Sequence, residues 1–199
     1  MVCSHCLITA SGIDENRHIF VDTVPHTGRL FQHLVRNCFV FTPTVVVRRQ
    51  CLEDIGLFNE ELSVSEDFNL WLRIAARWEI AIIPEVLAIV KKRPGSLSVT
   101  TSPDEQLRSG VASLEHVRSS CSGLSPAEQN ALRLALAERI YFYGSHLLSA
   151  GDKTASRKHL VSALGLQFTH WRALAKLALS YLPGEIYGSL ARLKSAITV

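Results

Sequence analysis

Two adjacent carboxylates, Glu66 and Asp67, occupy a position where a loop is expected to meet a helix. Ser63 lies three residues before Glu66, a spacing that predicts a capping box, and Trp71 and Trp78 fall on one face of the helix that would follow. The positive end of the helix dipole favours an ionised acid in the first turn. Such a carboxylate can remove a proton from an attacking hydroxyl as a general base, although acidic first turns also occur simply as caps.

Four segments surround this pair in a fixed order. They are TPTVVVRR (residues 42–49), IGLFNEEL (55–62), EDFNLWLR (66–73) and RPGSLS (93–98). This order resembles the large inverting family of nucleotide-sugar glycosyltransferases with the GT-A fold, over roughly residues 38–98. The family has a strand ending in two basic residues, a Gly-x-Phe-Asp/Asn turn, a Glu-Asp-x-x-Leu-Trp helix start and a Pro-Gly-Ser loop. The resemblance specifies the family but not the substrate.

The resemblance implies a role for each residue of the helix start. Asp67 would be the general base that deprotonates the acceptor hydroxyl, which then displaces a nucleoside diphosphate with inversion at the anomeric carbon. Glu66 would be a supporting carboxylate. Trp71 would either pack the helix against the sheet or stack on a sugar, and its place on the apolar stripe favours packing. The reaction implied is hexosyl transfer to a glycan or lipid-linked acceptor, as in polysaccharide and cell-envelope synthesis.

The resemblance also places Lys91, Lys92, Arg93 and Ser96 in a loop that closes over the donor diphosphate. Cations there would offset the charge of the leaving group. The alternative is an ordinary solvated strand end. Many relatives have a histidine where this chain has Arg93, and arginine neutralises phosphate but does not ligate a metal ion.

The donor side of such an enzyme has no counterpart in this sequence. It contains no Asp-x-Asp motif, and only 37 residues precede Cys38, too few for the consecutive βα units of a nucleotide-binding half. Residues 7–22 resemble the strand pair that follows the metal motif, so the chain would begin just downstream of the metal. We therefore expect no cofactor in this chain, with Mg²⁺ or Mn²⁺ only in a complete enzyme, and no turnover by these residues alone.

The segments that would position this site are predicted to form an α/β fold with a mixed sheet. This would be part of a GT-A fold. Residues 38–47 are predicted to be one strand bent at Pro43, with further strands at 80–83 and 88–90 on either side of Pro84. A short helix is expected over residues 50–55, ended by Gly56, and a longer one from Ser65.

The second half is expected to be all-α. Ser102-Pro103 and Ser125-Pro126 are typical helix starts, and the second helix should end near Gly151. Helices should follow over residues 153–164 and 169–182 and after Pro183-Gly184. The pairing around Gly151-Asp152-Lys153, followed by Ala155, Leu160 and Ala163, resembles a tetratricopeptide-type hairpin. We predict two domains, an acceptor-side glycosyltransferase half over residues 1–100 and a helical domain over 101–199.

Composition excludes several classes of protein. A net charge of +3 is too small for a nucleic-acid-binding domain, although residues 166–199 hold four basic side chains against Glu185 alone. Five cysteines, an odd number, indicate reduced thiols in a cytoplasmic protein without disulfides. Neither a signal peptide nor a spanning helix is indicated. We expect a cytoplasmic protein, or one peripheral at the cytoplasmic face of a membrane.

Three alternatives stay open beside the enzyme. The Cys3-x-x-Cys6 pair suggests zinc, but a second pair of ligands is lacking. The helical half is also consistent with a non-catalytic interaction or scaffold module that carries a glycosyltransferase remnant. Finally, Trp171, Tyr181 and Tyr187 lie beside basic residues in the C-terminal helices and could contact an anionic membrane, although core packing explains these aromatics equally well.

Overall fold

A computed structural model of the chain describes residues 1–10, 13–19, 25, 27–92 and 94–183. The chain divides into two compact units, Met1–Ala135 and Leu136–Val199, which are described separately below. Residues 101–135, assigned from the sequence to the helical domain, belong to the first unit.

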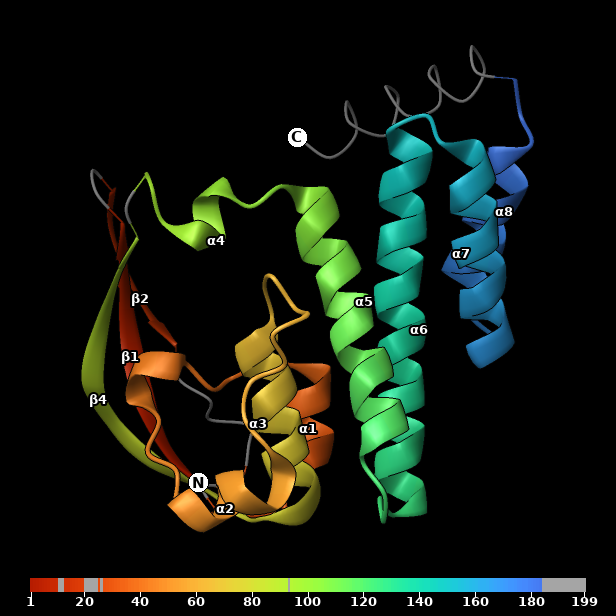
Figure 1. The fold of residues 1–199 in the computed structure, drawn as a ribbon. Helices are drawn as coiled ribbons and strands as arrows, with labels where there is room; N and C mark the ends of the chain where they lie inside the picture. The colour runs from red at the N-terminus through yellow and green to blue at the C-terminus, as the bar shows by residue number, and fades with distance from the viewer. Residues whose placement is uncertain (11–12, 20–24, 26, 93, 184–199) are drawn as a thin grey trace. The chain divides into compact units, whose positions relative to one another are not determined.

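The first unit contains a mixed sheet with the strand order β2-β1-β4-β3 (Figure 1). Strand β1 (Val2–Ala10) pairs antiparallel with β2 (Ile13–Ile19) and parallel with β4 (Ile80–Lys92). The two-residue β3 (Thr27–Gly28) pairs antiparallel with the start of β4. The predicted α/β class with a mixed sheet is thus confirmed, whereas its GT-A type stays a prediction.

Strand β4 runs through Pro84 as one element, so the prediction of two separate strands is wrong. The register explains how proline is accommodated, because Ser4 pairs with Ile83 but the next residue of β1, His5, pairs with Val86. The extra residues of β4 form a bulge at Pro84. Proline has no N–H to donate to a ladder, and a bulge is a position where none is needed.

Residues 38–47 do not form the predicted bent strand. Thr42–Thr44 form a 3₁₀ turn, η1, and Val46 alone pairs with the sheet, through an isolated bridge to Val2. The turn is stabilised locally, since the Thr44 hydroxyl donates to the Phe41 carbonyl at 2.7 Å. Pro43 is preset to the φ of such a turn, and the threonine side chain offers the backbone an alternative to a ladder.

Helices α1 (Phe31–Arg36) and α3 (Glu66–Arg77) lie between the sheet and α5 (Pro103–Ser120) in Figure 1. All residues from Phe68 to Ala76 are buried, so α3 is the central helix of this unit. The shorter helices are α2 (Arg49–Ile55) and α4 (Leu97–Thr100). The predicted end of α2 is confirmed, because Gly56 follows it with a φ of 82°, a conformation that L side chains rarely adopt.

Helix α6 (Pro126–Ser149) crosses the boundary between the units, and its second half lies in the second unit with α7 (Lys153–Leu166) and α8 (Trp171–Ser180). Gly144 of α6 approaches α7 closely, and the buried Ser156 hydroxyl donates to its carbonyl at 2.7 Å. The predicted helices over residues 153–164 and 169–182 correspond to α7 and α8. Their tetratricopeptide likeness stays a prediction, and the last predicted helix lies outside the described residues.

The predicted caps of α5 and α6 are confirmed. The Ser102 hydroxyl accepts from the Glu105 amide at 3.2 Å. At α6 the bonds are reciprocal, because Ser125 Oγ accepts from the Glu128 amide at 3.3 Å and Glu128 Oε2 accepts from the Ser125 amide at 2.8 Å. This is a complete capping box.

Candidate active site

Helix α3 begins at Glu66, and its N-cap is Ser65 in the left-handed conformation with a φ of 64°. The Ser65 side chain makes no capping hydrogen bond, and the capping box predicted from Ser63 and Glu66 is wrong. The reason is position, since Glu66 is the first residue of the helix and a capping box needs the third. The preceding loop is held instead by α5, whose Ser109 hydroxyl donates to the Val64 carbonyl.

Asp67 lies in the first turn, as predicted, and is half-buried. Its Oδ2 accepts a hydrogen bond of 2.6 Å from the hydroxyl of Thr42 in η1, and its Oδ1 accepts one of 2.6 Å from the Phe68 amide. Thr42 precedes Asp67 by 25 residues. The structure therefore joins the first and third of the four segments named in the sequence through a direct contact at the carboxylate.

Glu66 also lies in the first turn and is half-buried. Successive helical residues point about 100° apart, so the two carboxylates diverge rather than share one position. The Glu66 side chain makes no hydrogen bond or ion pair to a described residue. It is therefore available to a ligand, whereas Asp67 is already oriented by Thr42.

Trp71 is 4% exposed and packs edge-to-face on Phe58, with ring centroids 6.3 Å apart and an interplanar angle of 74°. Phe58 belongs to the second of the four segments. Such pairs add to the energy of burial. The arrangement supports the packing role of Trp71 over a stacking contact with a sugar.

The loop after β4 is described only in part. The backbone of Lys92 ends β4 opposite Ala10, and Lys91 is exposed. The side chain of Lys92 and all of Arg93 lie outside the described residues. Ser96 is half-buried at the N-cap of α4, and its carbonyl accepts from the Thr100 amide at 3.0 Å. The contact of this loop with a donor diphosphate stays a prediction.

Arg73 is a structural anchor of the site that the sequence reasoning did not single out. It is 8% exposed, and its guanidinium donates to Asn69 Oδ1 at 3.0 Å, to the Ile55 carbonyl at 2.6 Å and to the Leu57 carbonyl. Burial lowers the pKa of Arg73, an effect that nearby Cys121 partly opposes. The two bonds to the Ile55 and Leu57 carbonyls fasten the turn of the second segment to α3, and the bond to Asn69 lies within α3. The sequence signal was an arginine four residues after an asparagine within an otherwise apolar helix.

Asn69, fully buried, connects the same anchor to α5. Its Nδ2 donates to the Ser113 carbonyl at 3.0 Å and lies 3.1 Å from His116 Nδ1. Because the amide Oδ1 accepts from Arg73, both amide protons point at α5, and His116 Nδ1 is the acceptor. The proton of a neutral His116 is therefore on Nε2.

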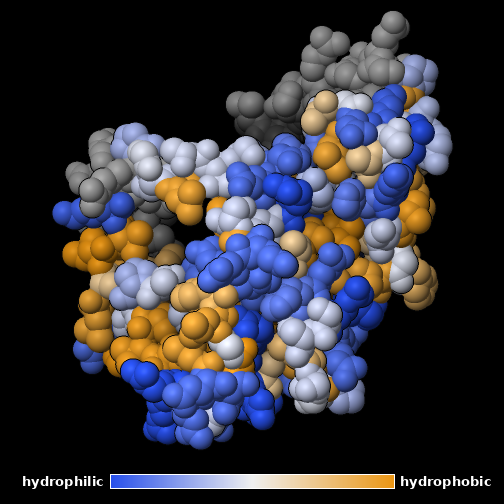
Figure 2. Space-filling model, viewed as in Figure 1, coloured by the Kyte–Doolittle hydropathy of each residue, from blue (hydrophilic) through white to orange (hydrophobic). Residues whose placement is uncertain are grey.

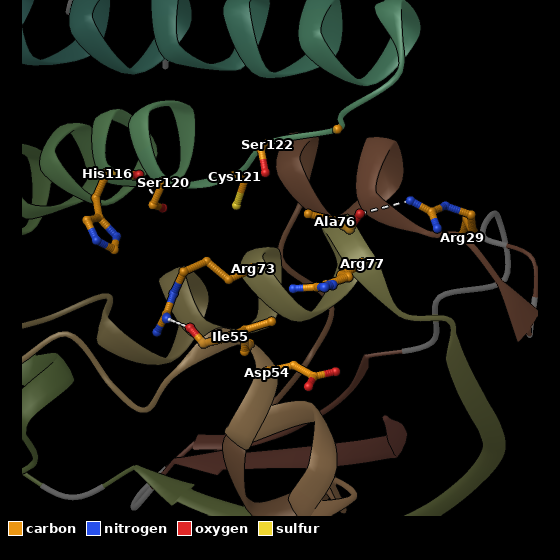
Figure 3. Close-up of a pocket in the computed structure, with 11 residues that line it drawn as sticks. Arg29, Asp54, Ile55, Arg73, Ala76, Arg77, His116, Ser120, Cys121 and Ser122 are labelled. Carbon is orange, nitrogen blue, oxygen red and sulfur yellow. Dashed lines mark hydrogen bonds between the residues drawn. The ribbon is translucent and has the colours of Figure 1, made fainter.

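A cavity of about 600 Å³ lies at the other end of α3 from Asp67 (Figure 3). Its lining combines three arginines and one carboxylate with residues from the ends of α2 and α5: Arg29, Asp54, Ile55, Arg73, Ala76, Arg77, His116, Ser120, Cys121, Ser122 and Gly123. Two of the arginines cap helix C-termini, since Arg73 donates to the carbonyl of Ile55 and Arg29 to that of Ala76 at 2.8 Å. Helix C-termini carry partial negative charge, which explains the arginines without a ligand.

The five cysteines carry free thiols. Among the described residues, no group of three His, Cys, Asp or Glu side chains is arranged to hold a metal ion. Cys3 and Cys6 are buried in β1, and burial raises the pKa of both thiols, whereas a metal ligand must be deprotonated. The described residues thus do not fit a bound cation.

Searches against protein-family models, curated proteins and solved structures found no match to this chain. In the part of the chain that the structure describes, no helix is both long and apolar enough to span a membrane.

Proposed function

We propose that residues 38–98 form the acceptor side of an inverting nucleotide-sugar glycosyltransferase, with Asp67 as the general base. The observation that supports this most is the 2.6 Å hydrogen bond from Thr42 to Asp67, because it joins two separate segments of the resemblance at the carboxylate itself. The Arg73 bonds to Ile55 and Leu57 join a third segment to the same helix.

The chemistry proposed for Asp67 is a single proton transfer coupled to substitution. The acceptor hydroxyl gives its proton to the carboxylate while its oxygen bonds to the anomeric carbon of the donor sugar. The bond from that carbon to the nucleoside diphosphate breaks, and its electron pair leaves with the diphosphate. Each carboxylate oxygen has two lone pairs, so Asp67 keeps acceptor capacity beyond the bonds from Thr42 and Phe68. Glu66 would bind a second acceptor hydroxyl.

The donor side of the reaction needs residues other than these 199. The sequence has no Asp-x-Asp motif, and no described cluster would hold the cation that neutralises a leaving diphosphate. We therefore propose that the chain binds a glycan or a lipid-linked acceptor. Turnover would require a donor-binding polypeptide that supplies the nucleoside diphosphate sugar and the Mg²⁺ or Mn²⁺ ion.

Saccharide binding by the chain tests the proposal directly. A glycan array followed by titration calorimetry of the best ligand should show binding that Asp67→Ala weakens at least fivefold. Glu61→Ala is the matched control, since Glu61 is an exposed acid in the loop before α3 and should leave binding unchanged. A chain that binds no saccharide at millimolar concentrations, or that binds equally well without the Asp67 carboxylate, contradicts the proposal.

Catalysis is a separate arm of the test. Sugar transfer should occur only when the chain is mixed with a donor-binding half, and Asp67→Asn should lower its rate by about 10²-fold or more, the usual contribution of a general base. Transfer by the isolated chain would overturn the requirement for a second polypeptide.

The alternative function is a non-catalytic helical interaction module that retains a glycosyltransferase remnant. The exposed apolar residues of α8, described below, favour it. If the chain binds no saccharide but binds a protein partner through α8, this alternative is favoured.

A further inference from the structure

Helix α8 has small buried residues on one face and large exposed apolar residues on another. Ala173 and Ser180 are fully buried on the inner face, toward α7. On the outer face, Trp171 is 73% and Leu174 is 58% exposed. A surface helix normally turns charged or polar residues to water, and one that is apolar all round is normally covered. The outer face of α8 is therefore a candidate binding surface.

The outer face forms one continuous stripe. At 3.6 residues per turn, its exposed residues fall within about 120° of the helix circumference. They are Trp171, Leu174, Ala175, Ala178 and Tyr181, and the exposed Phe168 stands just before the helix. We call these six residues the α8 stripe. Figure 2 shows hydrophobic surface beside α8, at the right of the view. Apolar residues gathered in this way indicate an interaction site rather than scattered exposure.

The helices that carry the α8 stripe have an excess of basic side chains, and one of them contacts the stripe. The Arg157 guanidinium lies 4.0 Å from the centre of the Tyr181 ring and donates to the Ser180 carbonyl. Lys158 is exposed on α7, and Lys176 is half-buried on α8 on the side away from the stripe. Residues 152–183 hold five Lys and Arg side chains against Asp152 alone. This excess of positive charge favours an anionic partner.

The net charge of the chain is divided unevenly between the two units. The second unit, residues 136–199, has eight basic and three acidic residues and a net charge of +5. The first unit, residues 1–135, has 13 basic and 15 acidic residues and a net charge of −2. The small total of +3 hides this division. An anionic surface would therefore attract the second unit and repel the first.

We propose that the α8 stripe binds the surface of an anionic lipid bilayer, with the helix axis parallel to the membrane plane. Phenylalanine, tryptophan and leucine would enter the boundary between headgroups and acyl chains, while basic side chains such as Arg157 and Lys158 contact lipid phosphates. Tryptophan and tyrosine suit this depth, since each has an apolar ring and one polar group that stays in the wet region. The inference is independent of the glycosyltransferase proposal.

Co-sedimentation with vesicles tests this inference. The whole chain is mixed with phosphatidylcholine vesicles, with or without phosphatidylglycerol, at low and at high salt. We expect sedimentation with the anionic vesicles at low salt, at least tenfold less with pure phosphatidylcholine, and a steep loss with added salt. The fluorescence of Trp171 should shift to the blue on binding, because its ring leaves water.

Variants locate the contact. The double change Trp171→Ser with Leu174→Ser should weaken vesicle binding at least tenfold, and both side chains are exposed enough to be replaced without loss of the core. Leu57→Ser is the matched control, since Leu57 is 68% exposed in the first unit and should leave binding unchanged. Lys158→Glu with Lys176→Glu should reduce both the binding and its dependence on salt. Circular dichroism checks that each variant keeps its helix content.

Three results would overturn the proposal. They are no sedimentation with anionic vesicles at low salt, sedimentation that the stripe variant leaves unchanged, and binding that does not depend on phosphatidylglycerol. Light scattering adds a fourth. A dimer that the stripe variant dissociates would show that a second copy of the chain, rather than a bilayer, covers α8.

Discussion

Replacing Arg73 with methionine should destabilise the first unit more than any other single loss of charge on α3. Methionine keeps most of the length and apolar volume of the side chain but removes the guanidinium. The Asn69 side-chain oxygen and the carbonyls of Ile55 and Leu57 then lose their donor. Because Asn69 is fully buried, water does not replace the lost bond there.

The magnitude follows from two opposing contributions. Hydrogen bonds to a charged group contribute about 1.5–3 kcal/mol each, so three would sum to about 4.5–9 kcal/mol if they were independent. Burial of the guanidinium opposes them, and the lowered pKa of Arg73 reflects that cost. Removing the guanidinium leaves three neutral acceptors without a donor, and an acceptor that stays shielded from water costs about 1–3 kcal/mol. We therefore expect a loss of about 3 kcal/mol, or about 10 °C in the melting temperature of a unit of this size.

Urea unfolding followed by tryptophan fluorescence measures this loss. Trp71 and Trp78 report on the first unit, so the assay uses a Trp171→Phe background that silences the second unit. Arg77→Met is the matched control, because Arg77 is exposed one turn further along α3 and has no hydrogen bond or ion pair to a described residue. The control should cost less than about 0.5 kcal/mol. If Arg73→Met costs less than about 1 kcal/mol, or no more than the control, the three bonds do not anchor the segment as argued.

Three further predictions concern the rest of the fold. Ser125→Ala should lower the free energy of unfolding by about 1 kcal/mol in urea, because it removes the acceptor of the Glu128 amide in the capping box of α6. An unchanged urea midpoint would show that this capping box does not stabilise the fold. Gly144→Ala should lower the free energy of unfolding by about 1–3 kcal/mol in a thermal melt, since the added Cβ would lie 3.2 Å from Leu160 Cγ. An unchanged melting temperature would mean that α7 shifts to accommodate the methyl group. Burial raises the pKa of the Cys3 thiol from 9.0 to about 11, with the N-terminal amine acting in the opposite direction. The folded chain therefore holds this proton more tightly than the unfolded chain, so the stability it contributes is complete below pH 9.0 and is lost as the pH rises towards 11. Urea midpoints measured across that range should fall less in Cys3→Ala, and equal slopes would contradict the shift.

The helix boundaries that the sequence predicted correctly are set by local chemistry. Ser102 and Ser125 cap the helices that follow them, and Gly56 and Gly151 adopt positive φ after the helices that they end. Each of these effects acts within about one turn of helix, so one stretch of sequence contains all the information required.

The strands were harder to predict because strand identity depends on a distant partner. Residues 38–47 have the composition of a strand, but only Val46 reaches the sheet, through Val2. Pro84 suggested a break, but β1 pairs with β4 on both sides of it and a bulge absorbs the mismatch. Neither outcome follows from propensity, since both are set by the register between β1 and β4.

The candidate site shows the same division between local and distant information. An acidic first turn could be predicted at Glu66 and Asp67, but the capping box predicted from Ser63 and Glu66 did not identify Ser65 as the N-cap. The partners of the anchor, Arg73 with the Ile55 carbonyl, lie 18 residues apart. Such contacts form only after the chain has folded, and sequence spacing does not encode them.

The contacts of Asp67 bear on whether this carboxylate is a cap or a site. A carboxylate that only caps needs one oxygen, which accepts from a free amide of its own helix. Asp67 gives one oxygen to the Phe68 amide and turns the other to Thr42, a side chain of another segment. Nothing about starting α3 requires that second bond, since helix starts are commonly capped within their own first turn. Its effect is to fix the direction of the carboxylate, and a fixed direction is what a general base requires and what a cap does not.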